Sequence, residues 1–212
     1  MLDSKLMNAL RKQRIGLLIL SFSLICFILI AFLRSSFSPV DASVNSWTVS
    51  IQSTSLTQIA RIIHYGFSTT ALVVITLLMA MYLFCRRHRN DALLLVAAML
   101  GDLIIVPIVK WSIHSPRPVN EIIQETGFSF PSGHAMNTVL LLGLLTYFIW
   151  QHFKSRNMKV LSGILFVLIS LLVGFSRIYL NVHWFSDVLG AYCLGVFWLT
   201  FSIVAFRLKW AQ

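Results

Sequence analysis

The chain has 212 residues, of which 58% are hydrophobic and only 11% are charged, and its mean hydropathy is +0.82. A soluble domain of this length is far more polar, so the composition excludes an ordinary soluble fold and indicates one integral-membrane domain over residues 1–212. The net charge of +10 does not indicate nucleic acid binding, because the basic residues form short clusters between apolar runs, as in membrane proteins that face anionic lipid.

Six apolar runs are long enough, with their flanking residues, to cross the hydrocarbon core of a bilayer. A helical conformation is expected, since backbone groups in lipid must find hydrogen-bond partners within their own segment. The first run follows a basic stretch, as in a signal peptide, but no small-residue cleavage site follows it. We therefore interpret it as a retained membrane anchor. The predicted spans are residues 15–33, 67–85, 92–109, 135–150, 160–175 and 188–206.

The segment between the first two spans, residues 35–68, carries apolar side chains at helical spacing. They are Val44, Trp47 and Ile51, followed by Ile59, Ile62 and Ile63. This spacing favours short amphipathic helices that lie in the membrane interface, with Asp41 as the N-cap of the first. A surface loop with scattered apolar residues is the alternative that the sequence leaves open.

The basic residues predict the orientation of the chain. If the N-terminus is cytoplasmic, most Lys and Arg residues fall on the cytoplasmic side, as expected for a plasma-membrane protein with both termini inside. The inner residues are Lys5, Arg11, Lys12, Arg14, Arg86, Arg87, Arg89, Lys154, Arg156, Lys159, Arg207 and Lys209. The outer residues are Arg34, Arg61, Lys110, Arg117 and Arg177. Three of these outer exceptions belong to short motifs that all lie at outer ends of spans, so a functional reason for them is expected.

The first of these motifs places Lys110 and Arg117 on either side of a short outer segment, and Pro118 restricts Arg117 to extended conformations. An arginine held in this way can bind phosphate oxygens in a bidentate manner, while lysine contributes a mobile point charge. Two ordinary cations at the membrane interface are the alternative for this segment alone.

The second motif, Pro131-Ser132-Gly133-His134, comes directly before the fourth span. Proline suits the first turn of a helix, glycine permits close approach of a ligand to the backbone, and free amide groups at a helix start attract anions. The motif therefore predicts a phosphate site with a histidine at its edge, although such a turn also caps many helices without any function.

The third motif adds a cation, Arg177, and then a histidine and a carboxylate four residues apart, His183 and Asp187. On a helix these two residues share a face. A carboxylate bonded to one imidazole nitrogen fixes the tautomer and raises the basicity of the other nitrogen, which prepares a histidine for nucleophilic attack. Pairs at this spacing also arise by chance, so the pair gains weight only from the motifs around it.

The order of the three motifs resembles the signature of the type 2 phosphatidic acid phosphatase family of membrane lipid phosphatases. In this chain the signature reads KWSIHSPRP, PSGH and SRIYLNVHWFSD, with no visible departure, over residues 110–187. The resemblance implies an all-α polytopic fold with six transmembrane helices and a site at the outer membrane–water interface.

The resemblance also implies roles for individual residues. His183 would attack phosphorus and form a phosphohistidine, Asp187 would orient it, and His134 would protonate the leaving oxygen and later activate water. The phosphate oxygens would be bound by Lys110, Arg117, Ser132, Gly133 and Arg177. No metal or other cofactor is expected, because three cations can stabilise the transition state and the chain has only 7 acidic residues as potential ligands.

The implied substrates are lipid phosphates or diphosphates, with undecaprenyl diphosphate and phosphatidylglycerophosphate as the leading pair and phosphatidate or diacylglycerol diphosphate behind them. The motifs bind phosphate rather than the lipid tail, so they do not choose among these lipids. A lipid phosphotransferase that uses the same site is the alternative enzyme, and a lipid transporter is a non-enzymatic alternative. The oligomeric state is left open.

Several polar residues outside the motifs have weaker interpretations. Asp102, in the middle of a span, is expected either to form a hydrogen bond between helices or to support the site indirectly. Glu121 and Glu125 are interpreted as solvated loop residues more readily than as part of an entrance. His64 could lie near the site from the outer amphipathic segment, but both it and His114 are interpreted as polar residues of the interface more readily than as catalysts. His88 and His152 belong to the inner basic clusters.

Overall fold

The computed structural model describes residues 4–210, with side chains described for residues 14–207. The described chain is built from helices alone: α1 (Ser4–Phe32), α2 (Arg34–Ser50), α3 (Thr54–Gly66), α4 (Thr69–Cys85), α5 (Arg89–Ile113), α6 (Gly133–His152), α7 (Arg156–Tyr179) and α8 (Phe185–Trp210). The all-α prediction is confirmed. The side chains of Lys5, Arg11, Lys12 and Lys209, which the orientation argument used, lie outside the described residues.

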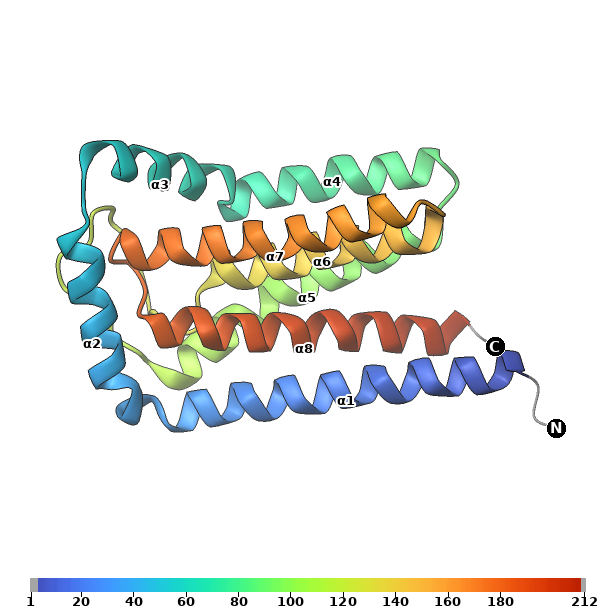
Figure 1. Cartoon of the computed structure of the whole chain (residues 1–212), viewed down its shortest axis with the longest axis horizontal. Helices are drawn as coiled ribbons and strands as arrows, with labels where there is room; N and C mark the ends of the chain where they lie inside the picture. Colours follow the sequence, from blue (N-terminus) through green and yellow to red (C-terminus); the bar gives the residue numbers. More distant parts are fainter. Residues whose placement is uncertain (1–3, 211–212) are drawn as a thin grey trace.

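The long helices run side by side as one bundle, with the start of α1 and the end of α8 at the same end of it (Figure 1). Five helices are long and apolar enough to span a bilayer, namely α1 from Arg14 onward, α5, α6, α7 and α8. Large apolar side chains face outward from them: Leu18, Phe22 and Phe32 of α1 are 70%, 72% and 83% exposed. This chain is therefore a multi-pass membrane protein, because such surfaces are stable in lipid rather than in water.

The second predicted span, residues 67–85, corresponds to α4 (Thr69–Cys85). α4 has 17 residues, and it completes a span only together with α3, to which it is bent by 48°. The prediction of helices in residues 35–68 is confirmed, but the two helices differ in placement. α2 lies across the end of the bundle that is far from the termini, whereas α3 runs along the side of the bundle toward α4 (Figure 1).

α6 is the central helix, and it packs against α4, α5, α7 and α8. Small residues allow this close packing. A Cβ atom on Gly143 would lie 2.4 Å from Leu199, and one on Gly195 would lie 3.0 Å from Val139. Close approach at small residues is a principal source of helix association in a bilayer, where lipid is as apolar as the helices themselves. The packing fixes the first turn of α6, which carries Gly133 and His134.

Asp41 does not cap a helix start, as the sequence predicted, because α2 begins at Arg34 and places Asp41 inside the helix. Its carboxylate instead accepts hydrogen bonds from the backbone N–H and the hydroxyl of Ser186, at 2.8 and 2.7 Å. Ser186 lies in the first turn of α8, where backbone N–H groups have no partner within the helix. Asp41 thus caps α8 from a distant segment and holds α2 against the end of the bundle.

Candidate active site

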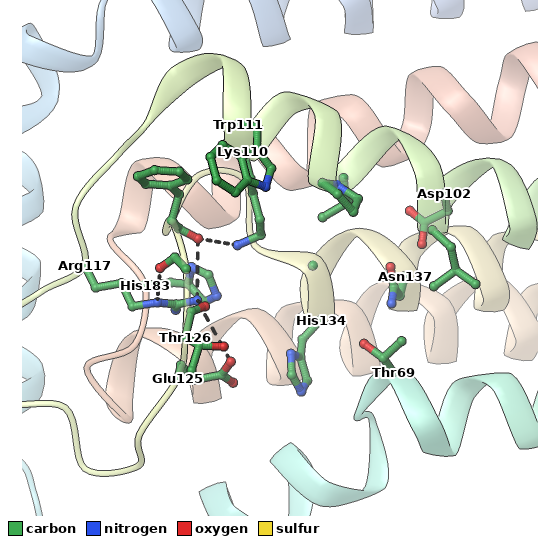
Figure 2. Close-up of a pocket in the computed structure, with 16 residues that line it drawn as sticks. Thr69, Asp102, Lys110, Trp111, Arg117, Glu125, Thr126, His134, Asn137 and His183 are labelled. Carbon is green, nitrogen blue, oxygen red and sulfur yellow. Dashed lines mark hydrogen bonds and ion pairs between the residues drawn. The ribbon is translucent and has the colours of Figure 1, made fainter.

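The three motifs come together at the end of the bundle that α2 covers. A cavity of about 480 Å³ lies there, and its lining includes Lys110, Arg117, Gly133, His134 and His183. Figure 2 shows these side chains converging from the end of α5, the loop after it, the start of α6 and the loop before α8. Ser132, Arg177 and Asp187 are fully buried and support this lining from outside it.

His183 and Asp187 are in contact, although they do not share a helix face as predicted. His183 lies in the turn before α8, and Asp187 lies in the first turn of α8. His183 Nδ1 is 3.4 Å from Asp187 Oδ2, but the two atoms are not aligned for a hydrogen bond. The same Oδ2 accepts the Trp184 N–H at 2.9 Å, which is the geometry of a capping box. The carboxylate is thereby fixed beside the imidazole.

Burial lowers the pKa of His183 to about 4, even though Asp187 acts in the opposite direction by favouring the charged form. The imidazole is only 2% exposed, and loss of hydration disfavours its cation. His183 is therefore neutral near pH 7. Since Nδ1 faces Asp187, Nε2 is the nitrogen with a free lone pair for the cavity.

Arg34 is a member of this site that the sequence did not reveal. Its Nη1 donates to Asp187 Oδ1 at 2.8 Å, and its guanidinium lies 4.4 Å from the centre of the Phe130 ring. A buried carboxylate with a fixed cation stays ionised. Arg34 lies at the start of α2, 153 residues before Asp187, so no local spacing in the sequence signals the contact.

The start of α6 contributes Ser132 as the N-cap, followed by Gly133 and His134. The expected place of Pro131 in the first helical turn is wrong, because Pro131 precedes the N-cap and follows a cis peptide bond. The backbone N–H of Ser132 donates to Asp187 O at 3.3 Å, which joins this turn to the third motif. Among the described residues, Ser132 Oγ and His134 Nε2 are buried and have no hydrogen-bond partner.

Lys110 and Arg117 both bind backbone carbonyl groups of the loop before α6. Lys110 Nζ donates to Phe128 O. The guanidinium of Arg117 donates to Gly127 O and Thr126 O, both at 3.0 Å, and to Val182 O at 2.7 Å. The Arg117 guanidinium, which was predicted to bind phosphate in a bidentate manner, is therefore held in place, but in this structure it binds carbonyl oxygens. Both cations keep the loop closed over the cavity.

Arg177 is buried, and it is paired with two residues that the sequence analysis placed outside the site. Its Nη2 donates to Glu125, and its Nη1 contacts His64 Nδ1. The interpretation of Glu125 as a solvated loop residue is wrong. Burial alone would raise the pKa of Glu125, but the charge and hydrogen bond of Arg177, together with the charge of Arg117, pull this pKa below the usual carboxyl range. Glu121 also lies near a site cation, with Oε1 3.9 Å from Arg117 Nε.

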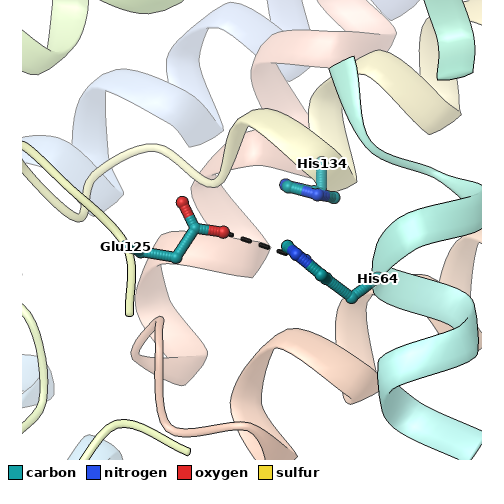
Figure 3. Close-up of side chains that lie close together, drawn as sticks. All are labelled: His64, Glu125 and His134. Carbon is teal, nitrogen blue, oxygen red and sulfur yellow. Dashed lines mark ion pairs between the residues drawn. The ribbon is translucent and has the colours of Figure 1, made fainter. Parts of the chain in front are cut away.

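His64 reaches the site from α3 and stacks on His134, with ring centroids 5.0 Å apart (Figure 3). Ligand atoms of His64, Glu125 and His134 lie within 4.8 Å of one another, as in some metal sites. The guanidinium of Arg177 contacts both His64 and Glu125. A dication would have to displace this permanent cation, so the arrangement fits a bound anion better than a bound metal.

Asp102 is fully buried and lines the inner end of the cavity together with Asn137. When the Asn137 amide is oriented to satisfy its neighbours, its nitrogen donates to Asp102 Oδ2 and to Gly133 O. Asp102 therefore forms the expected bond between helices, and it fixes Asn137, whose amide nitrogen binds Gly133 O in the first turn of α6. Figure 2 shows Asp102 and Asn137 facing each other across this part of the cavity.

Two known proteins are similar to this chain in sequence. Phosphatidylglycerophosphatase B of Bacillus subtilis is 34% identical over 82% of this chain and 88% of its own length. An undecaprenyl-diphosphatase of Sulfolobus acidocaldarius is 29% identical over 59% of each chain.

Two solved structures share the fold. The first transmembrane PAP2 type phosphatidylglycerolphosphate phosphatase from Bacillus subtilis has a TM-score of 0.84 and 26% identity, over 90% of this chain and 96% of that one. Aquifex aeolicus LpxE has a TM-score of 0.61 and 21% identity, over 76% and 93%. In the sequence, residues 91–211 match the PAP2 superfamily. The chain therefore belongs to the PAP2 superfamily and is a membrane phosphatase of that family.

Proposed function

We propose that this protein hydrolyses the terminal phosphate of a lipid phosphate or diphosphate through a phosphohistidine on His183. The observation that carries the proposal is the cavity itself, where a neutral imidazole backed by Asp187 faces a second histidine and several cations. This set contains a nucleophile, an acid–base group and charge stabilisation, which are the components that phosphoryl transfer requires.

In the first step, the lone pair of His183 Nε2 attacks phosphorus while the bond from phosphorus to the leaving oxygen breaks. His134, which carries a proton as the imidazolium that the negative charge of the bound phosphate favours, donates that proton to the leaving oxygen and becomes neutral. In the second step, His134 takes a proton from water, the water oxygen bonds to phosphorus, and the bond from Nε2 to phosphorus breaks. Asp187 orients the imidazole and stabilises its positive charge in the intermediate.

Lys110, Arg117 and Arg177 stabilise the phosphoryl oxygens in this proposal, together with the Ser132 hydroxyl and the Gly133 amide. Arg177 Nε and Ser132 Oγ support it, because both are buried without a hydrogen-bond partner among the described residues. A phosphate would supply acceptors for these atoms. It would also compete with Glu125 for Arg177 and with loop carbonyls for Arg117, so substrate binding loosens the loop over residues 125–128.

We further propose that the site faces the extracytoplasmic side of a plasma membrane and that both termini are cytoplasmic. The exposed arginines between α4 and α5, together with Lys154 before α7 and Arg156 at its start, lie at the end opposite the cavity, which the positive-inside rule assigns to the cytoplasm. The lipid head group then reaches the site at the membrane surface while its tail stays in the bilayer.

Phosphatidylglycerophosphate is the first substrate to test, because the relative named for that activity is 34% identical over most of both chains. Undecaprenyl diphosphate is the second, by the same reasoning from a more distant relative. Both present a terminal phosphate on an apolar anchor, and the cavity residues bind the phosphate in either case.

The test is phosphate release from a panel of these lipids and phosphatidate, with purified protein in detergent and a metal chelator present. Turnover of at least one lipid, with competitive inhibition by vanadate, is expected, because vanadate mimics the trigonal-bipyramidal phosphorus. His114→Ala is a matched control, since His114 lies in the first motif but is exposed. No phosphate release by wild type, or release that depends on an acceptor lipid instead of water, contradicts the proposed hydrolase.

A further inference from the structure

A second group of titratable side chains lies at the opposite end of the bundle from the cavity. His88 is the N-cap residue of α5, and Asp91 lies in the first turn of the same helix. His152 is the last residue of α6. One ligand atom from each of the three lies within 4.8 Å of the other two. Two separate connections, α4 to α5 and α6 to α7, therefore bring these groups to one point near the surface.

The contacts within this group join all three residues. His152 Nε2 lies 2.5 Å from Asp91 Oδ2, and the rings of His88 and His152 have centroids 4.2 Å apart. The Asp91 side chain is 10% exposed and that of His152 is 28% exposed. The carboxylate is thus held in place, while the imidazoles remain accessible to an ion from solution.

The spacing of the donor atoms suits a transition metal. Bonds of about 2.0–2.2 Å from imidazole and carboxylate to Zn²⁺ place neighbouring tetrahedral ligands roughly 3.3 Å apart. The observed separations run from 2.5 Å to at most 4.8 Å, so small rotations of the exposed imidazoles bring all three atoms to one ion. Two imidazoles and one carboxylate leave a fourth position for water, and this ligand type selects Zn²⁺, Ni²⁺ or Cu²⁺ over Mg²⁺ or Ca²⁺.

The charged residues around this cluster differ from those around the histidines of the cavity. Asp91 is an acidic residue beside the two histidines, and Arg89, next to His88 in sequence, has its guanidinium 5.1 Å from the centre of the Phe84 ring. Arg86 and Arg87 are exposed, so salt screens their charges. At the cavity, by contrast, Arg177 is buried and bonds directly to two members of the potential metal cluster.

We propose that His88, Asp91 and His152 form a binding site for one Zn²⁺-like divalent transition metal ion. The ion links the start of α5 to the end of α6, and these two helices carry Lys110 and His134 at their other ends. Metal binding therefore stabilises the folded bundle without contact with the cavity, since a ligand that binds only the folded state raises the free energy of unfolding. The proposal does not depend on which lipid the cavity accepts.

The experiment is a titration of Zn²⁺ into tag-free, full-length protein in detergent, by calorimetry and by competition with a chromogenic chelator. One equivalent is expected, with a rise in melting temperature. His88→Gln, Asp91→Asn and His152→Gln each weaken binding about tenfold or more, because loss of even an outer-shell partner costs ~10–100-fold. His114→Gln, which removes an exposed histidine at the other end, leaves the titration unchanged. A cobalt titration gives an independent visible spectrum of the bound ion.

The competing outcomes are distinct. Binding that is absent in wild type, or equal in wild type and all three variants, overturns the proposal and leaves only an Asp91–His152 hydrogen bond. Binding that is lost in His64→Gln but kept in His152→Gln also overturns it, because the ion then occupies the cavity histidines. Size-exclusion profiles and phosphate release by each variant show whether the variant is folded, since none of the three residues touches the cavity.

Discussion

Charged side chains lie at both ends of the bundle, but they are buried at the cavity end and exposed at the other end. At the cavity end, Arg177 and Asp187 are 0% exposed and His183 is 2% exposed. At the other end, Arg86, Arg87, Arg89, Lys154 and Arg156 are exposed. Exposed cations contribute to membrane orientation and little to stability, whereas buried charges require partners and therefore a defined geometry. Burial, rather than charge count, distinguishes the proposed catalytic end.

The largest effect is expected from His183→Ala. Loss of the nucleophile should reduce phosphate release by about 10⁴-fold or more, as in enzymes whose nucleophile and base act as one unit. Phosphate release is measured at saturating lipid, and melting temperature reports whether the bundle is intact. His114→Ala should retain wild-type turnover. Near-normal phosphate release by His183→Ala would contradict the assignment of the catalytic site to the cavity end.

His134→Gln is expected to have the next largest effect, a loss of ~10²–10⁴-fold, because proton transfer by a placed group contributes about that much. The loss should be smaller for a substrate whose leaving group needs no proton, such as an aryl phosphate with an acidic phenol. A comparison of the two substrates measures this difference. Equal losses on both would show that His134 has a structural role instead.

Arg34→Gln tests whether the carboxylate beside His183 depends on its cation. Without Arg34, the potential at His183 becomes more negative, so the pKa of His183 should rise from about 4 and turnover should fall about tenfold.

In wild type the low pKa of His183 also affects the pH dependence of stability. Stability contributed by neutral His183 is present above the ordinary pKa of 6.5 and is lost as pH falls toward 4.

The acid limb of kcat/KM measures this shift. It should move to higher pH in Arg34→Gln and return toward the wild-type position in Arg34→Lys, which restores the charge. An unchanged acid limb in Arg34→Gln, with only a lower melting temperature, would mean that Arg34 holds the fold and does not affect His183.

Glu125→Gln should have a smaller effect, on stability, and phosphate should reverse it. Arg177 would lose its charged partner, at a cost of ~2 kcal/mol, since hydrogen bonds to charged groups contribute about 1.5–3. In wild type this contribution is present above the ordinary carboxyl pKa and is lost as pH falls through the lowered pKa of Glu125. Melting temperature with and without vanadate is the measurement.

Vanadate should raise the melting temperature of Glu125→Gln more than that of wild type, because the anion then satisfies Arg177. Glu121→Gln is the matched control, since Glu121 approaches Arg117 and is ion-paired at 3.9 Å. Equal vanadate shifts in all three proteins would argue against anion binding at Arg177.

The smallest effect is expected at the exposed end. Arg156→Gln should change the free energy of unfolding by no more than about 0.5 kcal/mol and leave phosphate release unchanged, as is usual for surface substitutions. Combined with further neutral substitutions at Arg86 and Lys154, it should instead weaken the fixed orientation of the chain in the membrane. Cysteine labelling from either side measures orientation. A large loss of turnover in Arg156→Gln alone would contradict the division between the two ends.

The membrane helices were predictable because hydrophobicity and length are local properties of the sequence. The second span, residues 67–85, was predicted without its bend toward α3, since that bend depends on packing of α3 beside α7. The N-cap prediction for Asp41 was wrong for a similar reason. Its residue type suited an N-cap, but whether it caps its own helix or α8 depends on tertiary contacts.

The motif residues were predictable because each lies near an end of a predicted span, and the order of the spans alone places those ends on one side of the membrane. Arg34, His64 and Glu125 were not assigned to the site, because each reaches it through a contact between distant segments. One signal was present: Arg34 is among the few basic residues on the outer side of the predicted topology. A cation that departs from the positive-inside rule is therefore a candidate site residue even outside a motif.

The most direct test of the account is a search for the covalent intermediate. Purified protein is mixed with lipid substrate, quenched rapidly in base because phosphohistidine is acid-labile, and digested for mass spectrometry. The account predicts phosphate on the peptide that contains His183, its accumulation in His134→Gln if hydrolysis of the intermediate becomes slower than its formation, and its absence in His183→Ala. Phosphate found on another residue, or on none while His183→Ala still turns over substrate, would contradict it.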